Sequence, residues 1–374
     1  MIDRHRPPPT AILVACGIVA VLAVAAGLFI SFGSEESALD AFYRAPDGFE
    51  SADPGTLLRE EPMQATTGAT AYRMLYRTVG VEGEPIVASG FVAWPSSDPP
   101  EGGFPIVALG HATVGLADEC APSRSGFGTF YRAQVNAFLD AGFAVAGPDY
   151  TGLGPSGDHP YLSGETTGHS VIDAVRAGRE SGSALLSDRV VAWGYSQGGH
   201  AVLWARSMVE DVAPELDWSG TVALAPVVDL EVLVDSREFG GLLAVAVAMG
   251  REEQGLDTDD LLTDAGKDSR GDLEDGCIGP AIQKAEERDE PLLTRDRSWT
   301  TELGEDTPPA RGAGPALIVY GTEDHVVGTD ALRHWVLDAG NHGVEGFEVD
   351  GGEHGGLIDA ANDEVLEWML LSLT

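Results

Sequence analysis

Short apolar runs alternate with segments of helical period along most of this chain, and that alternation limits its fold more than any other feature. The apolar runs lie at 105–110, 143–149, 189–194, 221–225, 316–321 and 346–349, and the helical segments at 130–141, 171–179, 200–212, 331–338 and 357–371. Two earlier alternating segments, 71–79 and 85–94, should add strands at one edge. Strand, helix and strand joined by short links indicate a mainly parallel sheet with helices on both faces. We therefore predict an α/β fold.

The alternation fails between residues 229 and 309. An interruption of about 80 residues is too long for a loop inside a compact domain. We predict that 229–309 is a helical cap or lid inserted into a domain that spans 33–374. Within it, the apolar stretch 240–250 is either a buried cap helix or the lining of a channel for an apolar substrate.

The N-terminus carries a separate signal. Residues 1–10 include Arg4 and Arg6, and the 22 residues of 11–32 carry no charge. As a helix, such a run extends about 33 Å, enough to cross a hydrocarbon core of about 30 Å. Because basic residues remain on the cytoplasmic side, we predict a short cytoplasmic segment at 1–10. Residues 11–32 would be a signal anchor or a cleaved signal peptide, with the remainder on the outer face of the membrane or secreted.

The charge balance excludes one class of partner. The chain has 60 acidic and 22 basic side chains, a formal net charge of −38, and only two lysines. Nucleic-acid binding requires clustered Lys and Arg, so we expect no nucleic-acid partner. Three cysteines without a Cys-x-x-Cys pair are too few for a disulfide scaffold. Two of them, Cys120 and Cys277, can pair in an oxidising compartment.

A glycine-flanked serine follows the apolar run 189–194. The residues from Gly194 to Gly198 read GYSQG, which is the G-x-S-x-G pattern between a predicted strand and a predicted helix. In that context the glycines permit a sharp turn that exposes the serine hydroxyl. We predict Ser196 as a nucleophile, with Gly194, Tyr195 and Gly198 forming its elbow.

A serine nucleophile needs a histidine base, and the histidine needs a carboxylate that orients it. On such a sheet both should follow the serine at strand ends, the acid first. Asp324 follows the run 316–321, with Glu323 as its competitor, and His354 follows the last predicted strand in a glycine-rich loop. We predict a catalytic triad of Ser196, His354 and Asp324.

The negative oxygen of a tetrahedral intermediate requires two hydrogen-bond donors. We expect the backbone N–H of Gln197 to be one, and a backbone N–H in the loop after the first inner strand, residues 109–113, to be the other. The same loop contains His111, but the histidines show no ligand spacing such as H-E-x-x-H. We expect neither a metal nor a cofactor.

Several segments match one known pattern when they are taken together. They lie at 54–59 (PGTLLR), 111–113 (HAT), 120–123 (CAPS), 149–154 (DYTGLG), 193–199 (WGYSQGG), 321–324 (GTED) and 352–354 (GEH). In this combination the sequence resembles the secretory lipase family of α/β hydrolases, known from fungi and actinobacteria. The resemblance implies that the second oxyanion donor is the backbone N–H of Thr113. Ala112, beside it, departs from the pattern, because the family usually has glycine there.

The resemblance implies an α/β-hydrolase fold with an inserted lid and activity on carboxylic esters of acyl chains. Because the predicted lid contains an apolar helix, we expect a lipase that acts on medium or long acyl chains. A short-chain carboxylesterase, a serine peptidase and an inactive surface binding protein are the alternatives. The membrane is a partner only if residues 11–32 are retained.

Overall fold

The computed structural model describes residues 38–182, 185–236, 238–288 and 290–374. By its internal contacts the chain divides into a short unit that ends at Arg44 and a main unit from Ala45 to Thr374, which holds all the elements named below. The predicted segments 1–10 and 11–32 lie outside the described residues. Within the described part of the chain, no helix combines the length and the apolar character that a membrane span requires.

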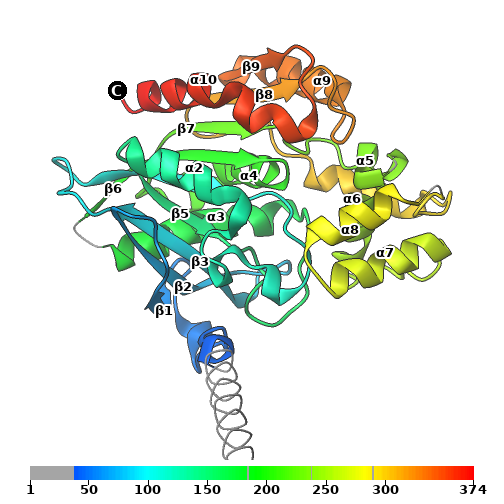
Figure 1. The fold of residues 1–374 in the computed structure, drawn as a ribbon, viewed down its shortest axis with the longest axis horizontal. Helices are drawn as coiled ribbons and strands as arrows, with labels where there is room; N and C mark the ends of the chain where they lie inside the picture. The colour runs from blue at the N-terminus through cyan, green and yellow to red at the C-terminus, as the bar shows by residue number, and fades with distance from the viewer. Residues whose placement is uncertain (1–37, 183–184, 237, 289) are drawn as a thin grey trace, which may run out of the picture. The chain divides into compact units, whose positions relative to one another are not determined.

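Among the described residues, nine strands form one sheet in the order β1-β2-β3-β5-β4-β6-β7-β8-β9 (Figure 1). They are β1 (Leu57–Pro62), β2 (Ala69–Val79), β3 (Pro85–Pro95), β4 (Phe104–Gly110), β5 (Ala144–Pro148), β6 (Leu186–Tyr195), β7 (Asp217–Leu224), β8 (Ala316–Gly321) and β9 (Val344–Val349). The strands from β5 to β9 along this order pair in parallel, and β1, β2 and β3 add an antiparallel edge. This confirms the predicted mainly parallel sheet, but β1 has no predicted counterpart.

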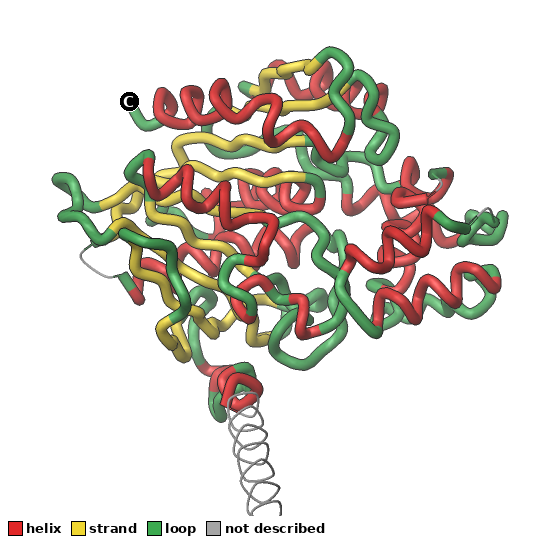
Figure 2. Tube along the Cα trace, in the orientation of Figure 1, coloured by secondary structure: helices red, strands yellow, loops and turns green. Residues whose placement is uncertain are grey.

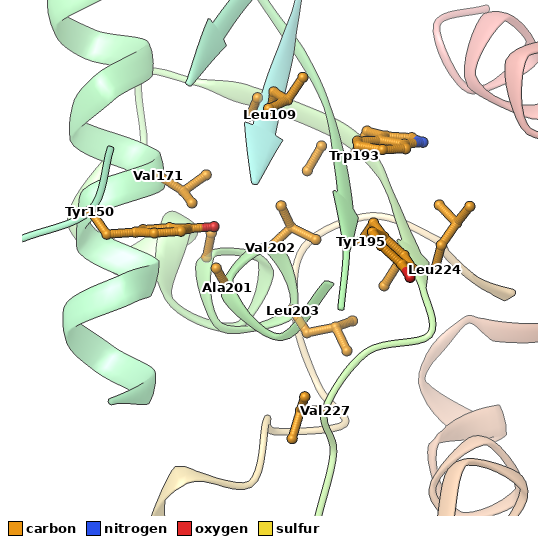
Figure 3. Close-up of a cluster of buried hydrophobic side chains, with 14 of the residues drawn as sticks. Leu109, Tyr150, Val171, Trp193, Tyr195, Ala201, Val202, Leu203, Leu224 and Val227 are labelled. Atoms are coloured by element: carbon orange, nitrogen blue, oxygen red, sulfur yellow. The ribbon is translucent and has the colours of Figure 1, made fainter. Parts of the chain in front are cut away.

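Helices cover both faces of the sheet. They are α2 (Gly128–Asp140), α3 (Gly164–Ser181), α4 (Gln197–Val212), α9 (Thr329–Ala339) and α10 (Leu357–Ser372). Helices α3 and α4 pack against each other on one face, and α2 and α10 cross the other (Figure 2). Figure 3 shows part of the resulting core, in which Val202 and Leu203 of α4 join Trp193 and Tyr195 of β6. Burial on both faces explains why the central strands read as continuous apolar runs.

Between β7 and β8 the chain leaves the sheet and forms a group of helices, which we call the cap (residues 225–315). It contains α5 (Glu231–Asp235), α6 (Glu238–Met249), α7 (Asp264–Glu274), α8 (Ile278–Glu286) and the 3₁₀ helix η4 (Ser298–Asp306). The predicted insertion, 229–309, falls inside it. Helix α6 packs against α5, α7 and α8, and its residues 242–248 are buried on every side. An enclosed helix needs no polar face, which explains the uninterrupted apolar stretch in the sequence.

A disulfide joins the cap to the sheet. Cys277, just before α8, bonds to Cys120 in the connection that follows β4, with their Cα atoms 5.4 Å apart. Beside it, the Ile278 N–H donates to the Val114 carbonyl at 2.8 Å. The two cysteines are 157 residues apart in sequence, so the bond closes a long loop in the unfolded chain.

Removal of this bond should lower the free energy of unfolding by about 2–5 kcal/mol, because the cross-link restricts the unfolded chain. Chemical unfolding should give the same curve for the Cys120→Ala/Cys277→Ala variant as for fully reduced wild-type protein. A reductant should leave the curve of the variant unchanged. A reduced wild-type protein as stable as the oxidised one would contradict this expectation.

Candidate active site

Ser196 occupies a strained turn between β6 and α4. Its φ is 56° and its ψ is −118°, a conformation that residues with a side chain rarely adopt. Glycines make the turn possible: a Cβ on Gly198 would lie 1.9 Å from the Gly110 carbonyl oxygen, and one on Gly194 would lie 2.1 Å from that of Gly198. The start of α4 therefore rests directly on the backbone of β4 and β6. This contact fixes Ser196 at the carboxyl end of the sheet.

Ser196, His354 and Asp324 meet in a line at this end of the sheet. His354 begins the 3₁₀ helix η6 (His354–Gly356) after β9. Its Nε2 lies 3.1 Å from Ser196 Oγ, and its Nδ1 lies 2.8 Å from Asp324 Oδ2. The three residues are at most 7% exposed. Three strand ends thus bring together residues that are 30 and 158 positions apart in sequence.

The Asp324 carboxylate is held on its other oxygen as well. Asp324 Oδ1 accepts backbone N–H groups of Val326 at 2.9 Å and Val327 at 3.2 Å. Its competitor Glu323 is exposed, and it makes no hydrogen bond to His354. A carboxylate only accepts, so Nδ1 of His354 carries the hydrogen and Nε2 can accept one from the Ser196 hydroxyl. The Tyr195 hydroxyl, which donates to the His354 carbonyl at 2.8 Å, steadies the loop.

The two residues predicted to hold an oxyanion come from different parts of the fold. Gln197 is the first residue of α4, where backbone N–H groups have no partner within the helix. Thr113 lies in the loop after β4 and lines the same cavity as Ser196. Ala112, which replaces the usual glycine, has a negative φ. Alanine therefore adds no backbone strain there, and its N–H donates to the Tyr131 hydroxyl.

Several buried polar residues that support these loops carry no motif in the sequence. The Thr113 hydroxyl lies 2.6 Å from the Tyr161 hydroxyl, and Gln197 Nε2 lies 3.2 Å from His159 Nε2. Tyr131, His159 and Tyr161 are all buried. Aromatic residues at apolar positions look like ordinary core, so sequence pattern alone offers no signal for them.

Asp149, in the segment DYTGLG, binds the connection that carries Cys120. Its carboxylate accepts the Ser89 hydroxyl at 2.5 Å and the Ser123 N–H at 2.8 Å. Burial raises the pKa of Asp149, and the hydrogen bonds from Ser123 and Ser89 oppose that effect. Nearby, both ring nitrogens of His111 contact backbone carbonyls, at 2.7 and 3.2 Å. Within the described ranges, no group of His, Cys, Asp and Glu side chains is placed to hold a metal ion.

A cavity of about 890 Å³ opens beside Ser196 and His354. The cap supplies apolar residues to its wall, among them Phe239, Ile278 and Ile282. Thr113 and the Cys120–Cys277 disulfide also line it. The cavity is therefore a mainly apolar space between cap and sheet, with the hydrogen-bonded line of Ser196, His354 and Asp324 at one side.

Comparison with known proteins agrees with this arrangement. Residues 130–293 match the family model described as secretory lipase. The match covers 164 of the 374 residues and shows what this segment is similar to. The predicted resemblance is thereby confirmed.

Curated relatives bear names of the same kind. A probable inactive lipase from Mycobacterium tuberculosis is 32% identical over 208 residues, which cover 51% of this chain and 46% of that protein. A secreted triacylglycerol lipase from Malassezia globosa is 27% identical, and the match covers 65% of this chain and 46% of that protein. A trichothecene C-3 esterase from Fusarium sporotrichioides is 34% identical, and the match covers 47% of this chain and 42% of that protein. The matches thus span just under half the length of these relatives.

Solved structures share the fold. Candida antarctica lipase A superimposes with a TM-score of 0.68 at 20% identity, covering 88% of this chain and 85% of that one. The rice cell wall degrading esterase from Xanthomonas oryzae gives a TM-score of 0.70 at 18% identity. The superposition covers 85% of this chain and 100% of that one. At such identities the likeness establishes the architecture, which is the predicted α/β-hydrolase fold.

The glycine contact at the turn can be tested through stability. Gly198→Ala places a Cβ against the Gly110 backbone, which cannot move aside without shifting β4. We expect the free energy of unfolding to fall by about 1–3 kcal/mol or more.

Gly271→Ala in α7 is the matched control, because its Cβ meets nothing within 4 Å. It should raise stability by about 0.5–1 kcal/mol. Chemical unfolding of both variants checks the pair, and a Gly198→Ala protein as stable as the control would refute the close contact.

Proposed function

We propose that this protein is a carboxylic ester hydrolase in which Ser196, His354 and Asp324 form the catalytic triad. The observation that carries the proposal is the hydrogen-bonded line from Asp324 Oδ2 through the His354 ring to Ser196 Oγ, beside an apolar cavity. The match of residues 130–293 to the secretory lipase model supports it. Both the acid and the base stand in the order and at the strand ends that this fold uses.

In the proposed reaction, Ser196 Oγ attacks the carbonyl carbon of the ester while His354 Nε2 takes the hydroxyl proton. His354 then gives that proton to the oxygen of the departing alcohol, which leaves an acyl group on Ser196. Water, activated by the same histidine, attacks the acyl carbon and releases the acid. Asp324 keeps the ring in the required tautomer and stabilises its protonated form.

Two backbone donors would hold the negative oxygen that develops during each attack. We assign these roles to the N–H groups of Gln197 and Thr113, which flank Ser196. Fixed donors lower the barrier because the oxygen carries its full charge only near the transition state. No cofactor takes part in this reaction.

For the substrate, we propose lipase-type esters with medium or long acyl chains. The size of the cavity and the apolar residues that the cap adds to it support this choice. Three Malassezia relatives are named secreted triacylglycerol lipases. The Fusarium relative is named an esterase, so a short-chain carboxylesterase is the competing reading.

The Mycobacterium tuberculosis relative is named an inactive lipase, which raises the question of whether this chain has lost activity too. The hydrogen-bonded line of Ser196, His354 and Asp324 favours an active enzyme. An inactive binding protein would have no need to keep a nucleophile, a base and an acid at 3.1 and 2.8 Å from one another.

We also propose that the main unit works outside the cytoplasm. Two basic residues followed by an uncharged run at 11–32 support export. The Cys120–Cys277 disulfide supports it independently, because such bonds persist in oxidising compartments.

Ser196→Ala should lower kcat for ester hydrolysis by about 10⁴–10⁶-fold, since it removes the nucleophile. A fluorophosphonate probe should label wild-type protein at Ser196 and leave the variant unlabelled, as peptide mass spectrometry would show. Ser97→Ala, at an exposed serine, is the control and should match the wild type. Label on another residue, or an active Ser196→Ala enzyme, would refute the proposed triad.

A series of p-nitrophenyl esters from acetate to palmitate tests the acyl preference. Each methylene that enters the cavity should raise kcat/KM about fourfold until the apolar wall is filled. Ile282→Ala, which shortens a cap side chain on that wall, should lower kcat/KM for decanoate more than for acetate. Highest activity on acetate, with no change in Ile282→Ala, would favour the short-chain esterase.

A further inference from the structure

One short segment holds the side chains of both residues assigned to the oxyanion hole. We call residues 159–162 the brace. Tyr161 of the brace places its hydroxyl 2.6 Å from the hydroxyl of Thr113. His159 of the brace places Nε2 3.2 Å from the side-chain amide nitrogen of Gln197. The two donor residues are 84 positions apart in sequence, and the brace is where their supports meet.

The hydrogen-bond direction at His159 follows from its partners. Its Nδ1 lies 2.7 Å from the Thr151 carbonyl, which can only accept, so Nδ1 carries the hydrogen. Nε2 is then an acceptor and takes an N–H of the Gln197 amide. Burial lowers the pKa of His159 to about 4, so the ring is neutral at physiological pH. In this contact the Gln197 amide is therefore always the donor and His159 Nε2 always the acceptor.

The brace is itself clamped from the cap. Arg251, which follows α6 and is buried, donates to the Tyr161 carbonyl at 3.0 Å and to the Leu162 carbonyl at 3.3 Å. Its guanidinium also pairs with Asp306 at 2.5 Å. Leu162 has a φ of 56°, a left-handed conformation that the surrounding contacts must maintain. The brace is thus a rigid support whose position is set by the cap.

The loop that carries Thr113 depends on such support. Residues 111–114 form no helix or strand, so no ladder of backbone hydrogen bonds fixes the direction of the Thr113 N–H. Other contacts hold the loop as a whole, among them the bond from the Ala112 N–H to the Tyr131 hydroxyl, the one from the Ile278 N–H to the Val114 carbonyl and the one from the Tyr150 hydroxyl to the His111 carbonyl. The Tyr161 hydroxyl is the contact that acts on Thr113 itself.

We propose that Tyr161 and His159 are positioning residues that aim the two oxyanion donors. Neither residue is among those that line the cavity, so they act through Thr113 and Gln197 without touching substrate. The inference rests on the proposed function. Its kinetic signature follows from timing: the oxyanion forms only near the transition state, so a misaimed donor lowers kcat and leaves ground-state binding, and hence KM, nearly unchanged.

The test removes single hydroxyl groups. Tyr161→Phe should lower kcat about tenfold with KM within about twofold, which is the effect expected for the loss of one buried hydrogen bond. Thr113→Val, which removes the partner hydroxyl at equal size, should show the same lowered kcat with a nearly unchanged KM. Thr113→Ser, which keeps a hydroxyl, should recover most of the rate that Thr113→Val loses. The double variant Tyr161→Phe/Thr113→Val should be no slower than either single variant, because both remove one interaction.

Two further readouts separate positioning from a general loss of structure. An alkyl boronic acid, which becomes tetrahedral on the serine, should bind Tyr161→Phe about tenfold more weakly, in proportion to kcat. A matching alkyl amide, which stays trigonal, should bind as it does to the wild type. At the other donor, His159→Gln keeps an acceptor for the Gln197 amide and should retain more activity than His159→Leu.

Tyr72→Phe is the control, since Tyr72 stacks on Trp94 in the antiparallel part of the sheet and should leave kcat unchanged. An unchanged kcat in Tyr161→Phe, an effect on KM alone, or additive losses in the double variant would overturn the inference. If thermal unfolding shows that Tyr161→Phe is poorly folded, the comparison of Thr113→Val with Thr113→Ser decides the question. Failure of the proposed function is distinguishable, because Ser196→Ala would then keep its activity whatever the brace variants do.

Discussion

The structure depends on a direct contact between backbones at three glycines. At Gly110, Gly194 and Gly198 the backbones of β4, β6 and α4 meet directly, so the turn that carries Ser196 cannot slide along the sheet. Every other part of the site is placed relative to this point. The ends of β8 and β9 bring Asp324 and His354 to the serine, and the loop after β4 brings Thr113 to the cavity beside it. A side chain at the glycine contact would move all of these distances at once.

Much of this architecture can be read from the sequence, because it follows from local pattern. Parallel strands buried on both faces appear as apolar runs, and β8 has the predicted bounds, Ala316–Gly321. The residues now proposed as the triad could be selected in the same way, because glycine-rich turns mark strand ends and the fold dictates their order. The edge strand β1 could not, since its six residues, LLREEP, include three charges and show no alternation.

The supporting residues escape sequence analysis for a physical reason. A buried tyrosine in the core and a buried tyrosine that holds a loop have the same hydropathy, and only the hydrogen-bond partner of the hydroxyl distinguishes them. The partners here come from distant positions, as in the pairing of Tyr161 with Thr113 or of Arg251 with Asp306. Asp149 is an intermediate case, because its motif is visible in the sequence but its bonds to Ser89 and Ser123 are not.

Covalent bonds join the cap to the sheet domain at three separate places. Its two ends continue into β7 and β8, and Cys277 is bonded to Cys120. A body held at two points can still turn about the line between them, as a door turns on its hinges, but a third point off that line removes this rotation. As long as the disulfide is intact, the cap therefore cannot swing as one rigid piece. Access to Ser196 past the cap then requires bending within the cap or side-chain movement at the rim of the cavity.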